Sequence, residues 1–162
     1  LSKWRDKGLG VLTDLGSHVL DICLYWFGEK IKFLKIVELN RFENKAPDHS
    51  IIILEINKIK IELEMTLCMW MNSFTCDIVG SKGSGHLNSL SKWSKSTFIY
   101  RKRRLPSGLP NEQVVSFSKG DPTWKAELLF FKKLINAKVQ TNLKRDLILN
   151  NCFLQFAKSI GR

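Results

Sequence analysis

Residues 8–28 have the sequence GLGVLTDLGSHVLDICLYWFG, which is the most informative stretch of the chain. Apolar residues recur in it at steps of three and four, which is the period of an α-helix. The apolar stripe of this helix consists of Val11, Leu15, Val19, Ile22 and Trp26. Gly8 and Gly10 free the backbone before the helix, and Gly28 is placed to end it in a left-handed conformation. The pattern predicts a helix over residues 10–27.

The pattern after this helix is that of β-strands. Residues 59–65 alternate apolar and charged side chains with period two, and Asn57-Lys58 before them is a candidate tight turn. Six further segments have strand character, namely 31–39, 50–56, 74–79, 86–90, 97–101 and 114–117. Two helices follow, one over 123–135 with Asp121 as its N-cap and Pro122 in its first turn, and one over 143–160. Strands followed by helices predict an α+β fold with a mainly antiparallel sheet.

The length of 162 residues suffices for one domain, and we expect residues 1–162 to form a single domain. The chain begins at Leu1 and its first element follows at once, so we expect it to be cut from a larger protein. Asp14, His18 and Asp21 interrupt the first apolar stretch, which therefore resembles neither a signal peptide nor a membrane span. Cys23, Cys68, Cys76 and Cys152 form no close pair and have apolar neighbours. Buried thiols in a soluble cytoplasmic protein are the expectation.

The formal net charge of +11 admits two interpretations. Residues 78–111 contain no acidic residue but many Lys and Arg, with Trp93, Phe98 and Tyr100 among them. Such a segment suits a nucleic acid or an anionic lipid surface, since bases stack on aromatic rings and phosphates attract cations. It equally suits a solvated sheet face with a basic loop. We favour the solvated face and expect neither nucleic-acid nor membrane binding, because charge alone indicates only loose association.

Asp14, His18 and Asp21 are the candidate site. Their spacings of four and three residues place them on one side of the predicted helix, and His18 is expected beside the apolar stripe. A carboxylate one turn from an imidazole fixes its tautomer and raises its basicity, as general acid–base catalysis near neutral pH requires. The same spacing is also common in surface pairs, and three such residues are a possible metal site. Spacing alone does not decide among these alternatives.

Residues 80–85 have the sequence GSKGSG, which suggests either a phosphate-binding loop or a glycine turn. A phosphate loop uses the N-terminus of the helix that follows it, whereas a strand-like segment follows here. We therefore interpret these residues as a turn.

Residues 8–21 and 24–28 resemble a motif of the glucose-fructose oxidoreductase/inositol dehydrogenase/rhizopine catabolism (Gfo/Idh/MocA) family. In that family a glycine-rich turn leads into a helix with D-x-x-x-H and a following Asp, then aromatic residues and a glycine. Residues 78–83 are similar to the family's I-x-G-x-x-G turn, and residues 124–131 to its late acidic and aromatic helix start. The resemblance covers essentially the whole chain. It implies the C-terminal domain of the family, which is a large, mostly antiparallel sheet with helices packed on one face.

The resemblance also implies an activity and the residues that perform it. His18 would take or give the hydroxyl proton of a sugar or cyclitol during hydride transfer with NAD or NADP. Asp14 would orient His18 or the substrate, and Asp21 would lie in the same substrate-binding region. The chain has neither the glycine fingerprint nor the Glu-Lys-Pro of the family's Rossmann domain, so we expect the cofactor to be bound mainly by that absent domain and the chain alone to be inactive. A homo-oligomer formed through the sheet is also implied. The remaining hypotheses are a non-catalytic binding or oligomerisation module and a basic nucleic-acid-binding domain.

Overall fold

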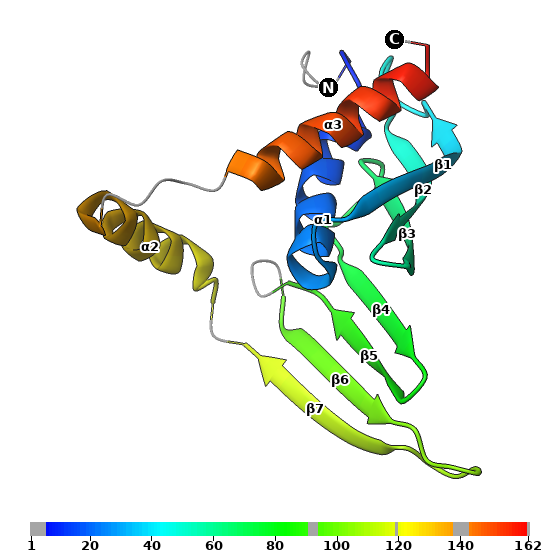
Figure 1. Ribbon diagram of the computed structural model, residues 1–162, viewed down its shortest axis with the longest axis vertical. Helices are drawn as coiled ribbons and strands as arrows, with labels where there is room; N and C mark the ends of the chain where they lie inside the picture. The colour runs from blue at the N-terminus through cyan, green and yellow to red at the C-terminus, as the bar shows by residue number, and fades with distance from the viewer. Residues whose placement is uncertain (1–5, 91–93, 119, 138–142, 162) are drawn as a thin grey trace. The chain divides into compact units, whose positions relative to one another are not determined.

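The computed structural model of the protein describes residues 6–90, 94–118, 120–137 and 143–161 (Figure 1). The chain divides into two compact units. The first combines Leu1–Met69 with Thr141–Arg162, and the second is Trp70–Gln140. The second unit is therefore inserted between two segments of the first.

The first unit is a three-stranded sheet with two helices. In chain order its elements are α1 (Val11–Phe27), β1 (Ile31–Asn40), β2 (His49–Ile56), β3 (Ile59–Thr66) and α3 (Leu143–Ser159). The strands are antiparallel in the order β1-β2-β3. Helix α1 packs against β2, β3 and α3, and α3 also contacts β1. All five elements lie within one or two residues of the predicted positions.

The core of the first unit lies between the helices and the sheet. Alternate residues of β2, from Ser50 to Ile56, are buried, which is the period of a strand with one covered face. The ring of Phe156 in α3 meets Phe33 of β1 edge to face at a centroid distance of 5.2 Å. The buried apolar residues that these elements share are Val11, Leu12, Leu20, Cys23, Leu24, Ile52, Leu54, Ile56, Met65, Cys152 and Phe156.

The buried side of α1 is rotated from the predicted stripe. Trp26, predicted in the stripe, is 42% exposed, and Ile22 is only partly buried. The helix buries a different set of residues, which consists of Val11, Leu12, Gly16, Leu20, Cys23 and Leu24. The sequence contains two overlapping apolar stripes, the predicted one and one formed by Leu12, Leu20 and Leu24. The second stripe is the one that packs against the sheet.

A buried carboxylate organises the loop before β2. Asp48 accepts backbone N–H bonds from Phe42 at 2.9 Å, Glu43 at 2.7 Å and Asn44 at 2.9 Å, and the Asn44 side-chain amide adds a fourth at 3.2 Å. Burial by itself raises the pKa of Asp48, but these hydrogen bonds to the charged form outweigh burial and lower the pKa below 3.8. The loop is therefore held by an ionised side chain.

The loop in turn holds the start of α1. The Pro47 carbonyl accepts the backbone N–H of Val11 at 2.8 Å. Gly10 just before it has φ 53° and ψ −125°, a conformation that glycine adopts readily and other residues rarely. The first turn of α1 is thus positioned by two residues that are distant in sequence, Pro47 and Asp48.

The lowered pKa of Asp48 predicts acid sensitivity. Since its pKa is lower in the folded than in the unfolded chain, this carboxylate stabilises the fold above about pH 4 and loses that contribution as the pH falls through its folded pKa. Asp48→Asn should lower the unfolding free energy by about 1–3 kcal/mol at neutral pH, because three backbone N–H groups and the Asn44 amide lose a charged acceptor. Urea unfolding of both proteins at neutral and acidic pH measures this. The difference should shrink at acidic pH, and a difference that stays constant would contradict the assignment.

The end of α1 is held by the turn between β2 and β3. Asn57 and Lys58 have φ 49° and 68°, as expected for a tight two-residue hairpin turn. The Asn57 side-chain amide donates to the Phe27 carbonyl at 2.5 Å, and the Gly28 N–H donates to Leu24 at 3.0 Å. Gly28 has the expected positive φ of 94°, but its ψ of −177° is extended rather than left-handed helical.

The second unit contains a four-stranded sheet and one helix. Its elements are β4 (Thr75–Gly80), β5 (Gly83–Asn88), β6 (Ser96–Lys102), β7 (Asn111–Phe117) and α2 (Thr123–Ala137). The strands are antiparallel in chain order. Gly80 pairs with Gly83, so residues 80–85 form a hairpin turn and the start of β5. Asp121 accepts the Thr123 N–H at 2.9 Å, as predicted for an N-cap.

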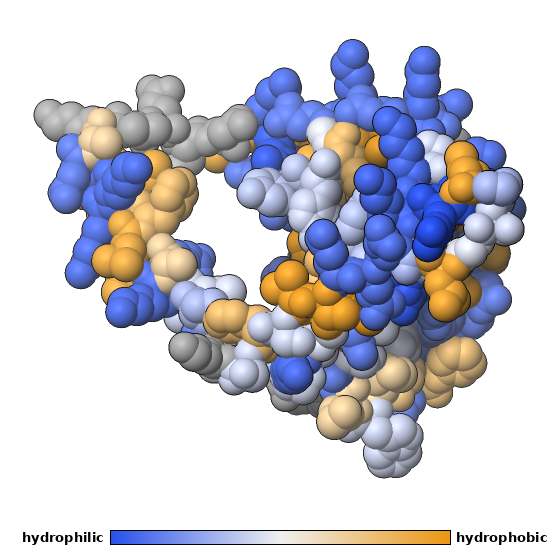
Figure 2. Space-filling model, turned by 90° about the horizontal axis from the view of Figure 1, so that it is seen from below, coloured by the Kyte–Doolittle hydropathy of each residue, from blue (hydrophilic) through white to orange (hydrophobic). Residues whose placement is uncertain are grey.

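The second unit exposes more apolar surface than the first. No residue of α2 is buried, and apolar side chains are visible along it in Figure 2. The exposed apolar residues of this helix are Trp124, Leu128, Leu129, Phe130, Phe131 and Ile135. Val115 and Phe117 of β7 are 63% and 40% exposed.

The structure confirms the α+β fold class and the antiparallel pairing of all strands in the described residues. The strands form two sheets rather than one continuous sheet, with the break between β3 and β4. No helix in the described part of the chain is both long and apolar enough to cross a membrane.

Candidate functional site

Helix α1 brings Asp14, His18 and Asp21 to one side, away from the buried Leu12, Gly16 and Leu20. His18 is exposed, and the two aspartates are partly buried. Leu15 and Val19 of the predicted stripe are partly buried and pack against the core, and His18 next to Val19 in sequence is exposed. The His18 imidazole lies on the solvent side of α1.

Asp14 lies in the first turn of α1. Its Oδ2 atom is buried from solvent. The amide of the same residue donates to the Gly10 carbonyl at 3.0 Å, which ties the residue to the helix start described above. The backbone of this part of the site is fixed by Gly10 and Pro47.

Asp21 contacts the last helix. Its Oδ1 atom lies 3.6 Å from an Nη of Arg145 in α3, and the Arg145 guanidinium lies over the Tyr25 ring at 5.7 Å from the centroid. Lys144, next to Arg145, bonds Glu29 beyond the end of α1 at 2.7 Å. These contacts give Asp21 a role in joining α1 to α3.

Two residues of this region were not predicted from the sequence. Tyr25 follows Asp21 by four residues and His18 by seven, so helical spacing was a usable signal for it. Arg145 offers no local signal, because its contact joins segments at opposite ends of the chain. Together the side chains form a polar face on α1, consisting of Asp14, His18, Asp21, Tyr25 and the neighbouring Arg145.

The polar face is chemically suited to proton transfer. An exposed imidazole donates or accepts a proton near neutral pH, and two carboxylates flank it along the helix. Asp21 lies against Arg145 of α3. In the described residues no group of three or more His, Cys, Asp or Glu side chains is arranged to hold a metal ion.

The described residues do not fit a dinucleotide. A pyrophosphate needs free backbone N–H groups at a helix N-terminus after a glycine-rich turn. Such a turn precedes α1, but the amides of Val11, Leu12 and Thr13 donate to backbone carbonyls at 2.8 Å, 3.2 Å and 3.1 Å. The turn at residues 80–83 leads into strand β5. A nicotinamide cofactor would have to be held by residues outside those described.

The four cysteines are free thiols. Cys23 and Cys152 are buried, as predicted, whereas Cys68 and Cys76 are only partly buried. Burial raises the pKa of the Cys152 thiol, which keeps it protonated and unreactive.

A family model described as "GFO/IDH/MocA C-terminal domain" matches residues 2–86. The chain belongs to the GFO/IDH/MocA family, whose members are generally NAD(P)-dependent oxidoreductases. No curated protein and no solved structure matches the chain.

Proposed function

We propose that this chain is the substrate-side domain of an NAD(P)-dependent oxidoreductase that acts on a hydroxyl group of a sugar, a cyclitol or a related compound. The observation that carries the proposal is the placement of Asp14 and His18 on the exposed side of α1, within the family match. Both compact units would belong to this one domain. NAD or NADP would be bound mainly by a partner dinucleotide-binding domain.

His18 is the proton-transfer group in this proposal. A hydroxyl substrate bound on the polar face of α1 gives its proton to the imidazole on oxidation and takes it back on reduction. Asp14 orients the imidazole or a second hydroxyl of the substrate. Arg145 holds Asp21, and through it keeps α1 and α3 together beneath the substrate.

Assembly and location form part of the same proposal. Strand β3 carries Lys60, Glu62 and Glu64 on its exposed side, and Ile53 of β2 pairs with Glu62. A second copy of the sheet that meets this face buries isoleucine while pairing opposite charges, which favours a homo-oligomer. The spaced cysteines agree with the reducing cytoplasm.

The proposal is tested by comparing the 162-residue chain with a protein in which a dinucleotide-binding domain precedes it. Isothermal titration of the chain alone with NADH and NADPH should detect no binding below millimolar concentrations. The reason is that the first backbone N–H groups of α1 already donate to backbone carbonyls. The joined protein should bind the cofactor and form NADH or NADPH when sugars and cyclitols are supplied. Micromolar cofactor binding by the chain alone, or a joined protein that binds cofactor but oxidises no hydroxyl substrate, would overturn the proposal.

A further inference from the structure

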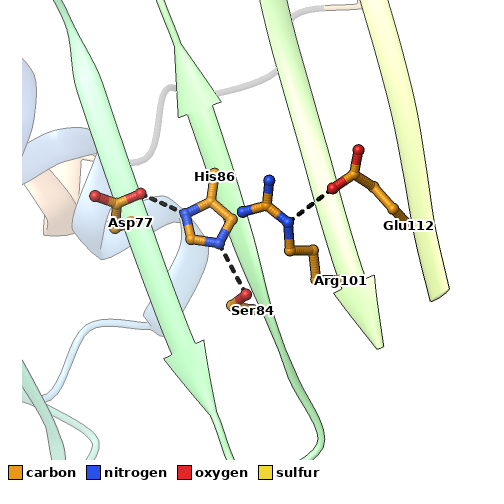
Figure 3. A network of polar contacts seen from close by, with 5 residues as sticks. All are labelled: Asp77, Ser84, His86, Arg101 and Glu112. Carbon is orange, nitrogen blue, oxygen red and sulfur yellow. Dashed lines mark hydrogen bonds and ion pairs between the residues drawn. The ribbon is translucent and has the colours of Figure 1, made fainter. Parts of the chain in front are cut away.

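The polar side of the β4–β7 sheet carries a second group of titratable side chains, distant in sequence from Asp14 and His18. Asp77 on β4 and His86 on β5 are paired across the two strands, and Ser84 lies two residues before His86 on the same side of β5. Figure 3 shows the three side chains joined in a line. The Ser84 Oγ lies 2.8 Å from Nε2 of His86, and Nδ1 of His86 lies 2.6 Å from Oδ1 of Asp77.

We take the His86 ring as neutral, and the directions of these hydrogen bonds follow from that tautomer. An ionised carboxylate only accepts, so Nδ1 of His86 carries the proton that it donates to Asp77. Nε2 of the neutral ring is then the acceptor, and the Ser84 hydroxyl donates to it. The imidazole is therefore held in the tautomer that removes a proton from the serine, which is the arrangement of an activated nucleophile.

The surroundings of Ser84 suit an ester. Arg101 on β6 is its cross-strand neighbour, and the Arg101 side chain bonds Glu112 on β7 through Nε at 2.7 Å. That bond uses Nε, and the two terminal Nη groups of the guanidinium are further donors. Three apolar residues share this side of the sheet in register with the polar ones, namely Val79, Ile99 and Val114. Asp77 and His86 have side chains 70% and 30% exposed, so a reagent can approach from solvent.

We propose that Ser84, activated by His86 and Asp77, is a nucleophilic site for esters of small carboxylic acids, separate from the oxidoreductase site on α1. Ser84 Oγ attacks the ester carbonyl carbon, a new C–O bond forms, and the serine proton passes to Nε2 of His86. The bond to the leaving alcohol then breaks, and His86 returns the proton to the leaving oxygen. Water, deprotonated by His86, attacks the acyl-serine and releases the carboxylic acid, which restores Ser84. Arg101 stabilises the negative oxygen that develops at the carbonyl.

The test uses the 162-residue chain with a fluorophosphonate and with p-nitrophenyl acetate. Peptide mass spectrometry should locate the phosphonyl adduct on Ser84, and p-nitrophenol should be released at a rate above that of buffer. Ser84→Ala should abolish the adduct, and His86→Gln should slow labelling by about 10²–10⁴-fold, since it removes the base but keeps the strand. Asp77→Asn should also slow labelling, because His86 loses the carboxylate that keeps its proton on Nδ1.

Ser116→Ala is the matched control, because Ser116 pairs with Thr97 on the same side of the sheet but lies away from His86. It should label at the wild-type rate. Circular dichroism of every variant checks that the strands are retained. Absence of an adduct in the wild-type chain, equal labelling in His86→Gln, or labelling spread over several serines would each overturn the proposal.

Discussion

On the proposed function, His18→Ala should lower kcat by about 10²–10⁴-fold in a protein that joins this chain to a dinucleotide-binding domain, because the proposed proton acceptor is removed. Cofactor affinity should change little, since the described residues do not fit a dinucleotide. Steady-state kinetics and cofactor titration of the same preparations separate the two effects.

Two further variants distinguish catalysis from packing at the same helix face. Asp14→Asn should lower kcat by misorienting the imidazole or the substrate. Asp21→Asn should mainly weaken the contact with Arg145, so it should affect stability more than turnover. Near-normal turnover in His18→Ala, with circular dichroism unchanged, would end the catalytic assignment. The domain would then be better described as a binding or oligomerisation module.

Gly10→Ala is expected to produce the largest loss of stability of any single methyl addition to the helix start. A Cβ atom at residue 10 would lie 2.0 Å from the Pro47 carbonyl oxygen, which is backbone and has no freedom to rotate away. The change costs the positive-φ penalty of about 1–2 kcal/mol and the buried hydrogen bond from Val11, so we expect a total of roughly 3–4 kcal/mol. That is a large share of the stability of an ordinary domain.

Gly8→Ala provides the matched control for this prediction. Gly8 also has a positive φ, of 67°, but a Cβ atom there meets nothing within 4 Å. Its replacement should therefore cost only the conformational penalty of about 1–2 kcal/mol. Urea unfolding measures the loss of unfolding free energy in both variants. Equal losses would show that the contact with Pro47 is not the reason why residue 10 must be glycine.

The elements of this fold were predictable because their signals are local. The alternation in residues 59–65, the Asn57-Lys58 turn and the Asp121 cap each depend on neighbours in the chain, and all three are present. The division into two sheets was not predictable, since nothing in residues 67–74 shows that hydrogen bonding stops between β3 and β4. The pairing of strands that no tight hairpin joins depends on tertiary packing, which a local sequence pattern does not reveal.

The candidate site was predicted in part. Spacing placed Asp14, His18 and Asp21 on one face of a helix, and the structure agrees. The rotation of that face could not be predicted, because Leu12, Leu20 and Leu24 form as regular a stripe as the residues chosen. Asp48 and Arg145 were missed, since each acts through contacts with residues that are remote or that lie in a loop without a pattern. The catalytic roles of Asp14 and His18 stay predictions.

The insertion of one unit inside the other has a consequence for how the protein is made. Cys152 and Phe156 of α3 complete the core around Leu12 and Ile52, yet they are encoded after the whole of the second unit. On the ribosome, the β4–β7 hairpins can pair as soon as they emerge, because each strand bonds its immediate successor. The helix carrying His18 emerges earlier, and part of its apolar side stays uncovered until α3 has also emerged. The first unit thus completes its core only after the second unit has been translated, and a nascent chain halted before α3 presents that uncovered core to chaperones.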